Sequence, residues 1–354
     1  MPSHAVKTNT ASYQCYVERG ILSRLHDFLP VKHGKLFIVT TEDVWRLHGD
    51  KLTGQFPFDV LYFPGGENRK RLSEVESLAE QMLAKGADRS SVVIAFGGGI
   101  VGDLGGFLAA SFMRGIPVIQ VPTTLLAQVD ASIGGKTGAN LVGGKNLFGA
   151  FHQPSAVLAD PDVLQSLPVR EYRAGLFEVL KTGVIRSPEL FDLLTNHRDE
   201  VLAQEPKTVE HMISESVRIK CEVVTADEKE GDLRRILNFG HTIGHALESE
   251  TQYSRFLHGE AVSFGMTAAT HLAKSMGLLD KATAARVHDA INMYGPIPST
   301  AGIVAENLLT RLDKDKKAIQ GSVHFVLPTG IGSVTISSGI PDDKVLEAIT
   351  AALA

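Results

Sequence analysis

The chain has 354 residues, 44% of them hydrophobic and 21% charged, which is typical of a globular protein long enough for two domains. Lys and Arg total 35 against 40 for Asp and Glu, and the formal net charge of -5 argues against a general affinity for nucleic acid. We find neither a signal-peptide pattern nor an apolar run of about 18 residues, so we expect a soluble protein without a membrane partner. Cys15 and Cys221 lie far apart in sequence, which favours a reduced, cytoplasmic setting.

Apolar runs and helical patterns alternate in the first half of the chain. KLFIVT (35–40), SVVIAF (91–96) and PVIQVP (117–122) are continuous β-rich runs, which predict buried parallel strands. Between the first two, LSEVESLAEQMLAKGA repeats its apolar residues at helical spacing and stops at Gly86. The alternation predicts a doubly wound α/β domain over residues 1–166.

A glycine turn follows the second of these runs. Residues 97–102 read GGGIVG, a G-x-G-x-x-G pattern that lets backbone N–H groups approach a pyrophosphate at a helix N-terminus. A purely structural turn is the alternative. About 20 residues further on, where an acidic side chain usually binds the ribose, the sequence reads IQVPTT, and Asp103 is the nearest acidic candidate. We therefore predict a dinucleotide site of a variant kind.

The stretch from 114 to 146 is rich in cations set among glycines. Its lysines stand in GGKTG and GGKN, which suit loops that wrap an anionic ligand better than helix interiors. A solvated surface loop is the alternative. The pattern G-x-x-x-x-G-K-[ST] is not met, because Asp130 occupies the place of its leading glycine, so a P-loop ATPase is not expected.

The second half of the chain, residues 167–354, predicts a mainly helical domain, apart from a small hairpin around PTGIG in 322–337. HTIGH places His241 and His245 four residues apart on one helix face, and LHGEAV adds His258. AGLFEVLK supplies Glu178, with Lys181 three residues on. Two or three of these histidines with Glu178 would suit a catalytic zinc site, although each residue alone is unremarkable.

Together these motifs resemble those of the dehydroquinate synthases. The matching segments are GGGIVGDLGGFLAASFMRG, VPTTLLAQVDASIGGKTGAN, GKNLFGAFHQP, AGLFEVLKTG, LNFGHTIGHALE, LHGEAV, and DKK followed by FVLPTGIG. The resemblance implies a homodimeric lyase of the shikimate pathway that uses NAD and a divalent metal ion, zinc or cobalt. It would convert 3-deoxy-D-arabino-heptulosonate 7-phosphate to 3-dehydroquinate and phosphate.

The resemblance also implies individual roles. Glu178, His241 and His258 would hold the metal. The positions that match NAD contacts are Glu67, Lys70, Gly99, Gly102, Asp103, Thr123, Thr124, Lys136 and Lys145. The positions that match the substrate site are Arg114, Asp130, Lys136, Asn146, Lys181, Lys220, Arg234, Asn238, His245 and one lysine of the pair Lys316 and Lys317.

Three other functions remain open at this point. Another sugar-phosphate cyclase would act on a substrate without a carboxylate, and the presence of Lys220, Arg234 and Asn238 argues against it. A metal-dependent polyol dehydrogenase would need NAD in stoichiometric amounts and a less cationic site. A nucleotide-binding protein without catalytic activity would not need the metal and phosphate groups together.

Overall fold

The computed structural model describes residues 2–318 and 323–354, and it describes no side chain from residue 313 onward in helix α11 (Ala305–Ala318). The chain forms two compact units, the first made of Met1–Pro168 with Pro206–Lys229 and the second of Val169–Glu205 with Glu230–Ala354. The two functional domains inferred from the sequence, residues 1–166 and 167–354, stay a prediction.

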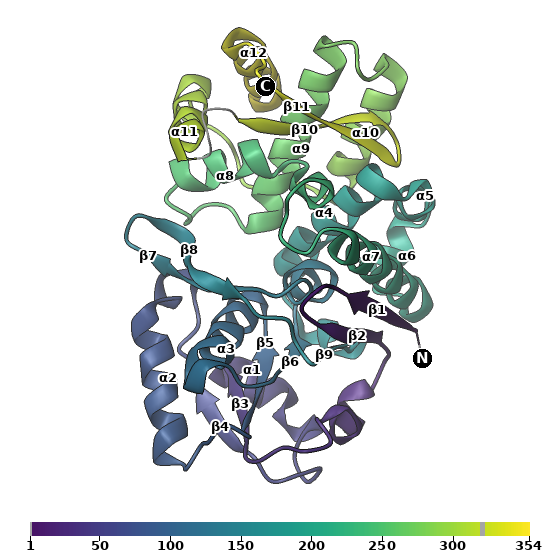
Figure 1. Ribbon diagram of the computed structural model, residues 1–354. Helices are drawn as coiled ribbons and strands as arrows, with labels where there is room; N and C mark the ends of the chain where they lie inside the picture. The colour runs from purple at the N-terminus through teal and green to yellow at the C-terminus, as the bar shows by residue number, and fades with distance from the viewer. Residues whose placement is uncertain (1, 319–322) are drawn as a thin grey trace. The chain divides into compact units, whose positions relative to one another are not determined.

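The first unit is built on a seven-stranded sheet with the strand order β1-β2-β9-β6-β5-β3-β4 (Figure 1). The strands are β1 (Ser3–Lys7), β2 (Ser12–Val17), β3 (Leu36–Thr40), β4 (Asp59–Tyr62), β5 (Val92–Gly97), β6 (Val118–Pro122) and β9 (Ala156–Ala159). All neighbouring strands are parallel except β1 and β2. The three strands predicted from apolar runs are confirmed as β3, β5 and β6.

The apolar runs are continuous because both faces of the sheet are covered. Phe37 and Val39 of β3 belong to one apolar cluster, with residues of α2 (Leu72–Ala84) and α3 (Gly99–Ser111). Leu36 and Ile38 of the same strand belong to a second cluster. Successive side chains of a strand point to opposite faces, so a strand buried on both sides has no polar face. Helix α1 (Glu42–His48) also belongs to this unit.

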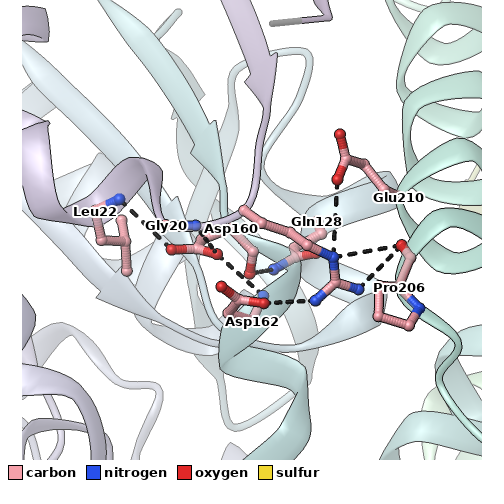
Figure 2. Close-up of polar contacts among 8 residues, drawn as sticks. Gly20, Leu22, Gln128, Asp160, Asp162, Pro206 and Glu210 are labelled. Atoms are coloured by element: carbon pink, nitrogen blue, oxygen red, sulfur yellow. Dashed lines mark hydrogen bonds and ion pairs between the residues drawn. The ribbon is translucent and has the colours of Figure 1, made fainter.

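Helix α7 (Pro206–Ala226) is part of the first unit although its sequence lies among the helices of the second. It packs on β1 and β2. Figure 2 shows the polar contacts at its first residue. Arg19 donates to the carbonyl of Pro206 from Nη2 at 3.1 Å and from Nε at 3.3 Å, and its Nη1 lies 2.5 Å from Asp162 Oδ1. These contacts fix the start of α7 against the sheet.

The part of the cation-rich stretch that carries Lys136 and Lys145 is a hairpin, not the loops expected from its glycines. Strands β7 (Lys136–Leu141) and β8 (Gly144–Phe151) pair antiparallel. Glycines on both strands permit this pairing: a Cβ at Gly138 of β7 would lie 2.9 Å from the carbonyl oxygen of Phe148, and one at Gly149 of β8 would lie 2.0 Å from that of Thr137. The two strands can approach only where side chains are missing.

The second unit is mainly helical, as predicted. Its helices are α4 (Val169–Arg186), α5 (Pro188–Asn196), α6 (Arg198–Leu202), α8 (His241–Glu250), α9 (His258–Ser275), α10 (Lys281–Tyr294), α11 and α12 (Asp342–Leu353). The predicted hairpin is present as β10 (His324–Gly330) and β11 (Ser333–Ser338). Among the described residues, no helix combines the length and the apolar character that crossing a membrane requires.

Candidate metal centre and nucleotide site

Three helices of the second unit approach one another through glycines. A Cβ at Gly259 of α9 would lie 1.9 Å from the carbonyl oxygen of Ala174 in α4, and one at Gly244 of α8 would lie 2.8 Å from that of Ala261 in α9. The backbones therefore touch where these glycines stand. His241 and His258 are the first residues of α8 and α9. The close packing brings both toward the middle of α4.

The candidate metal ligands meet at this point. Glu178 Oε1 of α4 lies 3.6 Å from Nε2 of His241 and 3.6 Å from Nε2 of His258. The Glu178 side chain is only 1% exposed, and neither carboxylate oxygen makes a hydrogen bond within the described residues. Lys181 Nζ forms a close ion pair with Oε2.

These donors fit a divalent metal ion. Lys181 compensates Oε2, but Oε1 is also buried without a hydrogen bond and faces both imidazoles, which is costly unless a cation compensates it. One carboxylate oxygen and two imidazole nitrogens within 4.8 Å of one another are a typical donor set for catalytic zinc, with room for substrate or water as a further ligand. The roles of the three residues as ligands stay a prediction.

His245 lies beside this group rather than in it. Its ring centroid is 5.4 Å from that of His241, as expected for residues four apart on one helix face. Its side chain is 54% exposed, and its Nε2 lies 3.9 Å from Glu248 Oε2. The donor set around Glu178 therefore contains two of the three histidines considered from the sequence.

The glycine turn of the first unit joins β5 to α3, the context that the motif requires. Gly97 ends the strand, and Gly99 begins the helix. A Cβ at Gly102 would lie 2.8 Å from Gln120 Oε1 of β6, and Gln120 Nε2 donates to the carbonyl of Gly102 at 3.0 Å. The third glycine thus permits close contact between helix and strand. Backbone N–H groups at a helix N-terminus favour anions, so the start of α3 is the candidate position for a ligand's phosphates.

The threonines of the NAD assignment lie at the next turn of the same sheet. Thr123 directly follows β6, and its backbone N–H donates to the carbonyl of Gly97 at 2.9 Å. Thr124 Oγ1 accepts from the N–H of Ala127 at 3.2 Å, and a Cβ at Gly98 would lie 3.1 Å from Thr124 Cγ2. Two neighbouring strand ends therefore bring the glycine turn and both threonines together.

A buried lysine connects three of the other assigned residues. Lys70 Nζ donates to Asp103 Oδ2 and to Asn146 Oδ1, each at 2.5 Å. Burial raises the pKa of Asp103, and the nearby Lys70 ammonium counteracts part of that rise. Asn146, which the family resemblance assigns to substrate, therefore lies with the residues assigned to NAD.

Asn140 completes this group and was missed by the sequence reasoning. Its Nδ2 donates to Glu67 Oε1 at 2.7 Å, and its Oδ1 accepts from the N–H of Asn146 at 2.8 Å. Lys145 Nζ lies 3.8 Å from Glu67 Oε2. Asn140 is the last residue of GGKTGAN, a segment of motif residues, and this position is the signal that could have identified it.

The remaining substrate candidates lie in both units. In the first, Lys220 of α7 forms a close ion pair with Asp130, which stands in a π-helical turn, Ala127–Ala131. Arg114 and Lys136 have exposed side chains.

In the second unit, Arg234 is 2% exposed, and Asn238 Nδ2 donates to Glu230 Oε1 at 2.6 Å. The side chains of Lys316 and Lys317 lie outside the described residues. A parallel-sheet unit with a glycine turn and a helical unit with a carboxylate–imidazole cluster define a class, the enzymes that use NAD together with a metal ion.

The chain belongs to the 3-dehydroquinate synthase family. The family models described as 3-dehydroquinate synthase N-terminal and 3-dehydroquinate synthase C-terminal match residues 60–174 and 175–318. The 3-dehydroquinate synthase of Solibacter usitatus is 61% identical over 357 residues, which cover 100% of both chains. The resemblance inferred from the motifs is confirmed.

Two solved structures share the fold. ValA, the 2-epi-5-epi-valiolone synthase of Streptomyces hygroscopicus subsp. jinggangensis with NAD+ and Zn2+ bound, matches with a TM-score of 0.89 and 30% identity over 97% of each chain. A 2-deoxy-scyllo-inosose synthase in complex with carbaglucose-6-phosphate, NAD+ and Co2+ matches with a TM-score of 0.87 and 26% identity over 99% of each chain. They confirm the predicted fold class and agree with the predicted cofactors.

Proposed function

We propose that this protein catalyses the 3-dehydroquinate synthase reaction. It converts 3-deoxy-D-arabino-heptulosonate 7-phosphate to 3-dehydroquinate and phosphate, a step toward the aromatic amino acids in the shikimate pathway. The observation that carries the proposal is the 61% identity to a 3-dehydroquinate synthase over the whole chain. Of the solved structures described above, ValA is 30% identical to this chain and the 2-deoxy-scyllo-inosose synthase is 26% identical.

The two domains of the proposal divide the cofactors between them. Residues 1–166 bind NAD through the Gly99–Gly102 turn and the group around Lys70, and residues 167–354 bind the metal through Glu178, His241 and His258. When bound, NAD supplies reversible oxidation of a substrate alcohol, and the metal supplies polarisation of that alcohol's oxygen. Because the oxidation is reversed within one turnover, NAD is needed in catalytic amounts.

The chain's own side chains bind and orient the substrate. A phosphate dianion and a carboxylate together need several cations, which Lys136, Lys181, Lys220, Arg234 and Lys316 supply. Arg234 is buried, so its planar group is held in one orientation and suits a planar carboxylate. Holding one substrate in one geometry through several bond changes is where positioning contributes most to the rate.

Another sugar-phosphate cyclase is the second candidate, because the solved structures that share the fold include a 2-epi-5-epi-valiolone synthase and a 2-deoxy-scyllo-inosose synthase. The second of these is bound to carbaglucose-6-phosphate, a sugar-phosphate analogue without a carboxylate. The two candidates differ in whether the substrate's carboxylate is recognised. A variant that removes a carboxylate-binding cation therefore distinguishes them.

The experiment measures phosphate release from each candidate substrate with trace NAD, with and without a metal chelator. We expect release only from the heptulosonate phosphate, dependence on metal and no net NADH. Arg234→Gln should raise the KM for that substrate strongly, while Arg235→Gln, one residue on, serves as the control. Release from sedoheptulose 7-phosphate or glucose 6-phosphate alone would replace the proposal by the second candidate, and net NADH would indicate a dehydrogenase.

The proposal includes a homodimer. Its support is a set of exposed apolar side chains on and beside the β7–β8 hairpin: Leu141, Val142, Leu147, Phe148 and Phe151. Val142 is 97% and Leu147 63% exposed. A patch of this kind often marks a protein–protein interface. Light scattering should give the mass of two chains, and Leu147→Asp should lower it toward one.

A cytoplasmic location is also proposed. Its support is that both cysteines are buried and free of disulfide bonds, as is usual in reducing compartments. Fractionation of cells that express the protein tests this location, and recovery in the secreted or membrane fraction would contradict it.

A further inference from the structure

His258 lies between two carboxylates of the second unit. Its Nε2 is 3.6 Å from Glu178 Oε1, and its Nδ1 is 3.5 Å from Glu248 Oε2. Both glutamate side chains are buried, Glu178 at 1% and Glu248 at 4% exposure. The two nitrogens of one imidazole therefore face carboxylates that come from different helices.

His241, the other candidate histidine ligand, is oriented in a similar way, but by a backbone carbonyl. His241 also directs Nε2 toward Glu178, and its Nδ1 lies 3.2 Å from the carbonyl oxygen of Phe239. A carbonyl can only accept, so Nδ1 carries the proton and Nε2 keeps its lone pair for a metal. Glu248 stands in the corresponding place for His258, and an ionised carboxylate is the stronger acceptor.

We propose that Glu248 is a positioning residue that orients His258 for metal binding. Its carboxylate accepts a hydrogen bond from Nδ1–H, which fixes the tautomer in which Nε2 is free to bind and raises the basicity of that nitrogen. The inference rests on the proposed metal site. No role was assigned to Glu248 from the sequence or from the family resemblance.

The helix geometry explains how one segment supplies both functions. Glu248 follows His241 by seven residues on α8, which is close to two full turns and places both on one face. His241 comes from the first turn and Glu248 from the last, and α9 begins with His258 beside them. The close contact of α8 and α9 at Gly244 keeps this arrangement compact.

The same atoms could also hold a second cation, since His245, Glu248 and His258 form another group of donors within 4.8 Å. Two observations disfavour it. His258 would have to bind through both nitrogens, which requires loss of the Nδ1 proton as well. His245 is 54% exposed, and its Nε2 lies 3.9 Å from Glu248 Oε2. A hydrogen bond from His258 Nδ1–H to Glu248 requires neither loss of the Nδ1 proton nor a contribution from His245.

The test compares Glu248→Gln with Glu250→Gln, a matched change two residues on, where the carboxylate pairs with Arg311 and Asn307 on the protein surface. Zn2+ affinity of the apo-protein is measured by competition with a chromophoric chelator, together with metal stoichiometry and the visible spectrum of the Co2+ form. We expect one equivalent of metal in each protein. Glu248→Gln should bind Zn2+ about 10–100-fold more weakly and change the Co2+ spectrum, with an unfolding free energy of the apo-protein close to that of the unsubstituted chain.

Unchanged affinity and an unchanged Co2+ spectrum in Glu248→Gln would overturn the inference. So would two equivalents of metal in the unsubstituted protein and one in Glu248→Gln, which would make Glu248 a ligand. If Glu248→Gln does not fold, Glu248→Asp keeps the charge but shortens its reach, and weaker metal binding by this variant supports the same role while unchanged affinity overturns it. The same measurements on Glu178→Gln distinguish failure of the proposed metal site from failure of the positioning role of Glu248. Full metal affinity in Glu178→Gln would refute the metal site itself.

Discussion

Buried carboxylates are treated differently in the two units. Asp160 of the first unit accepts hydrogen bonds from the backbone N–H groups of Gly20 and Asp162, both at 3.0 Å (Figure 2), and Asp103 accepts one from Lys70. Glu178 of the second unit makes no hydrogen bond within the described residues: its Oε2 forms an ion pair with Lys181, and its Oε1 faces two imidazoles. The protein's own N–H and ammonium donors therefore satisfy the carboxylates of Asp160 and Asp103. Glu178, by contrast, lies with two imidazoles in a group of donors that a metal ion would complete. This difference in hydrogen bonding distinguishes a candidate metal ligand from a carboxylate that the protein itself satisfies.

The strongest way to break this comparison is to neutralise Glu178. Glu178→Gln removes the one anionic donor while keeping the side chain's shape, so we expect loss of metal and a fall in turnover of about 10²–10⁴-fold, equivalent to several kcal/mol. Metal content after dialysis and the rate of phosphate release check this. Glu171→Gln in the first turn of the same helix is the control. Metal retained by Glu178→Gln at full occupancy would remove the distinction between the carboxylates.

Removing Lys70 tests whether Asp103 of the first unit depends on a donor from the protein itself. Lys70→Met deprives Asp103 and Asn146 of their shared donor, so the pKa of Asp103 should rise further because burial is then less opposed. We expect about 1.5–3 kcal/mol less stability and NAD binding that is weaker by about tenfold or more, with Zn2+ affinity unchanged. Urea unfolding and calorimetric titration measure these quantities.

Lys85→Met is the matched control for that experiment. Lys85 pairs with Asp59 at 2.9 Å, but both side chains are at least a third exposed, and an exposed pair contributes about 0–1 kcal/mol. Equal losses in the two variants would mean that the group around Lys70 is an ordinary surface pair. A loss of Zn2+ affinity in Lys70→Met would show that the two groups of carboxylates are not independent.

The sequence predicted the elements whose signal is local. β3, β5 and β6 are continuous apolar runs, and the glycine turn stands between a strand and a helix as its motif requires. The pairing of β7 with β8 was missed, because glycines at strand positions resemble those of a loop until the partner strand is known. The assignment of α7 to the first unit was also missed, since an amphipathic pattern predicts a helix but not the surface on which it packs.

The candidate site follows the same rule. Residue types pointed to Glu178 with two or three histidines, and the family resemblance selected Glu178, His241 and His258, whose donor atoms the structure brings within 4.8 Å of one another. Asn140 and Glu248 were not identified, because their contacts depend on tertiary packing. Asn140 reaches Glu67, 73 positions away in sequence, and Glu248 would be an ordinary polar residue in the last turn of a helix if α9 did not begin beside it. Side chains that position others are therefore harder to predict than the ligands they position.

The smallest expected effect concerns Asp160 and the pH dependence of stability. Burial raises the pKa of Asp160 above its ordinary value, although three backbone N–H groups counteract this. A carboxyl whose folded-state pKa is raised stabilises the fold below its unfolded pKa, and that contribution is lost as pH rises through the folded-state value. The unfolding free energy of the unsubstituted protein should therefore fall relative to Asp160→Asn as pH rises from about 4, by about 1.4 kcal/mol for each unit by which the pKa is raised. Above the folded-state pKa, the difference in unfolding free energy between the unsubstituted protein and Asp160→Asn should be constant.

Asp88→Asn is the control: hydrogen bonds from Ser90 lower the pKa of Asp88, so its contribution to stability is lost only as pH falls below about 4, and no change is expected above that pH. Parallel curves for both variants would mean that burial of Asp160 is already fully compensated by its donors.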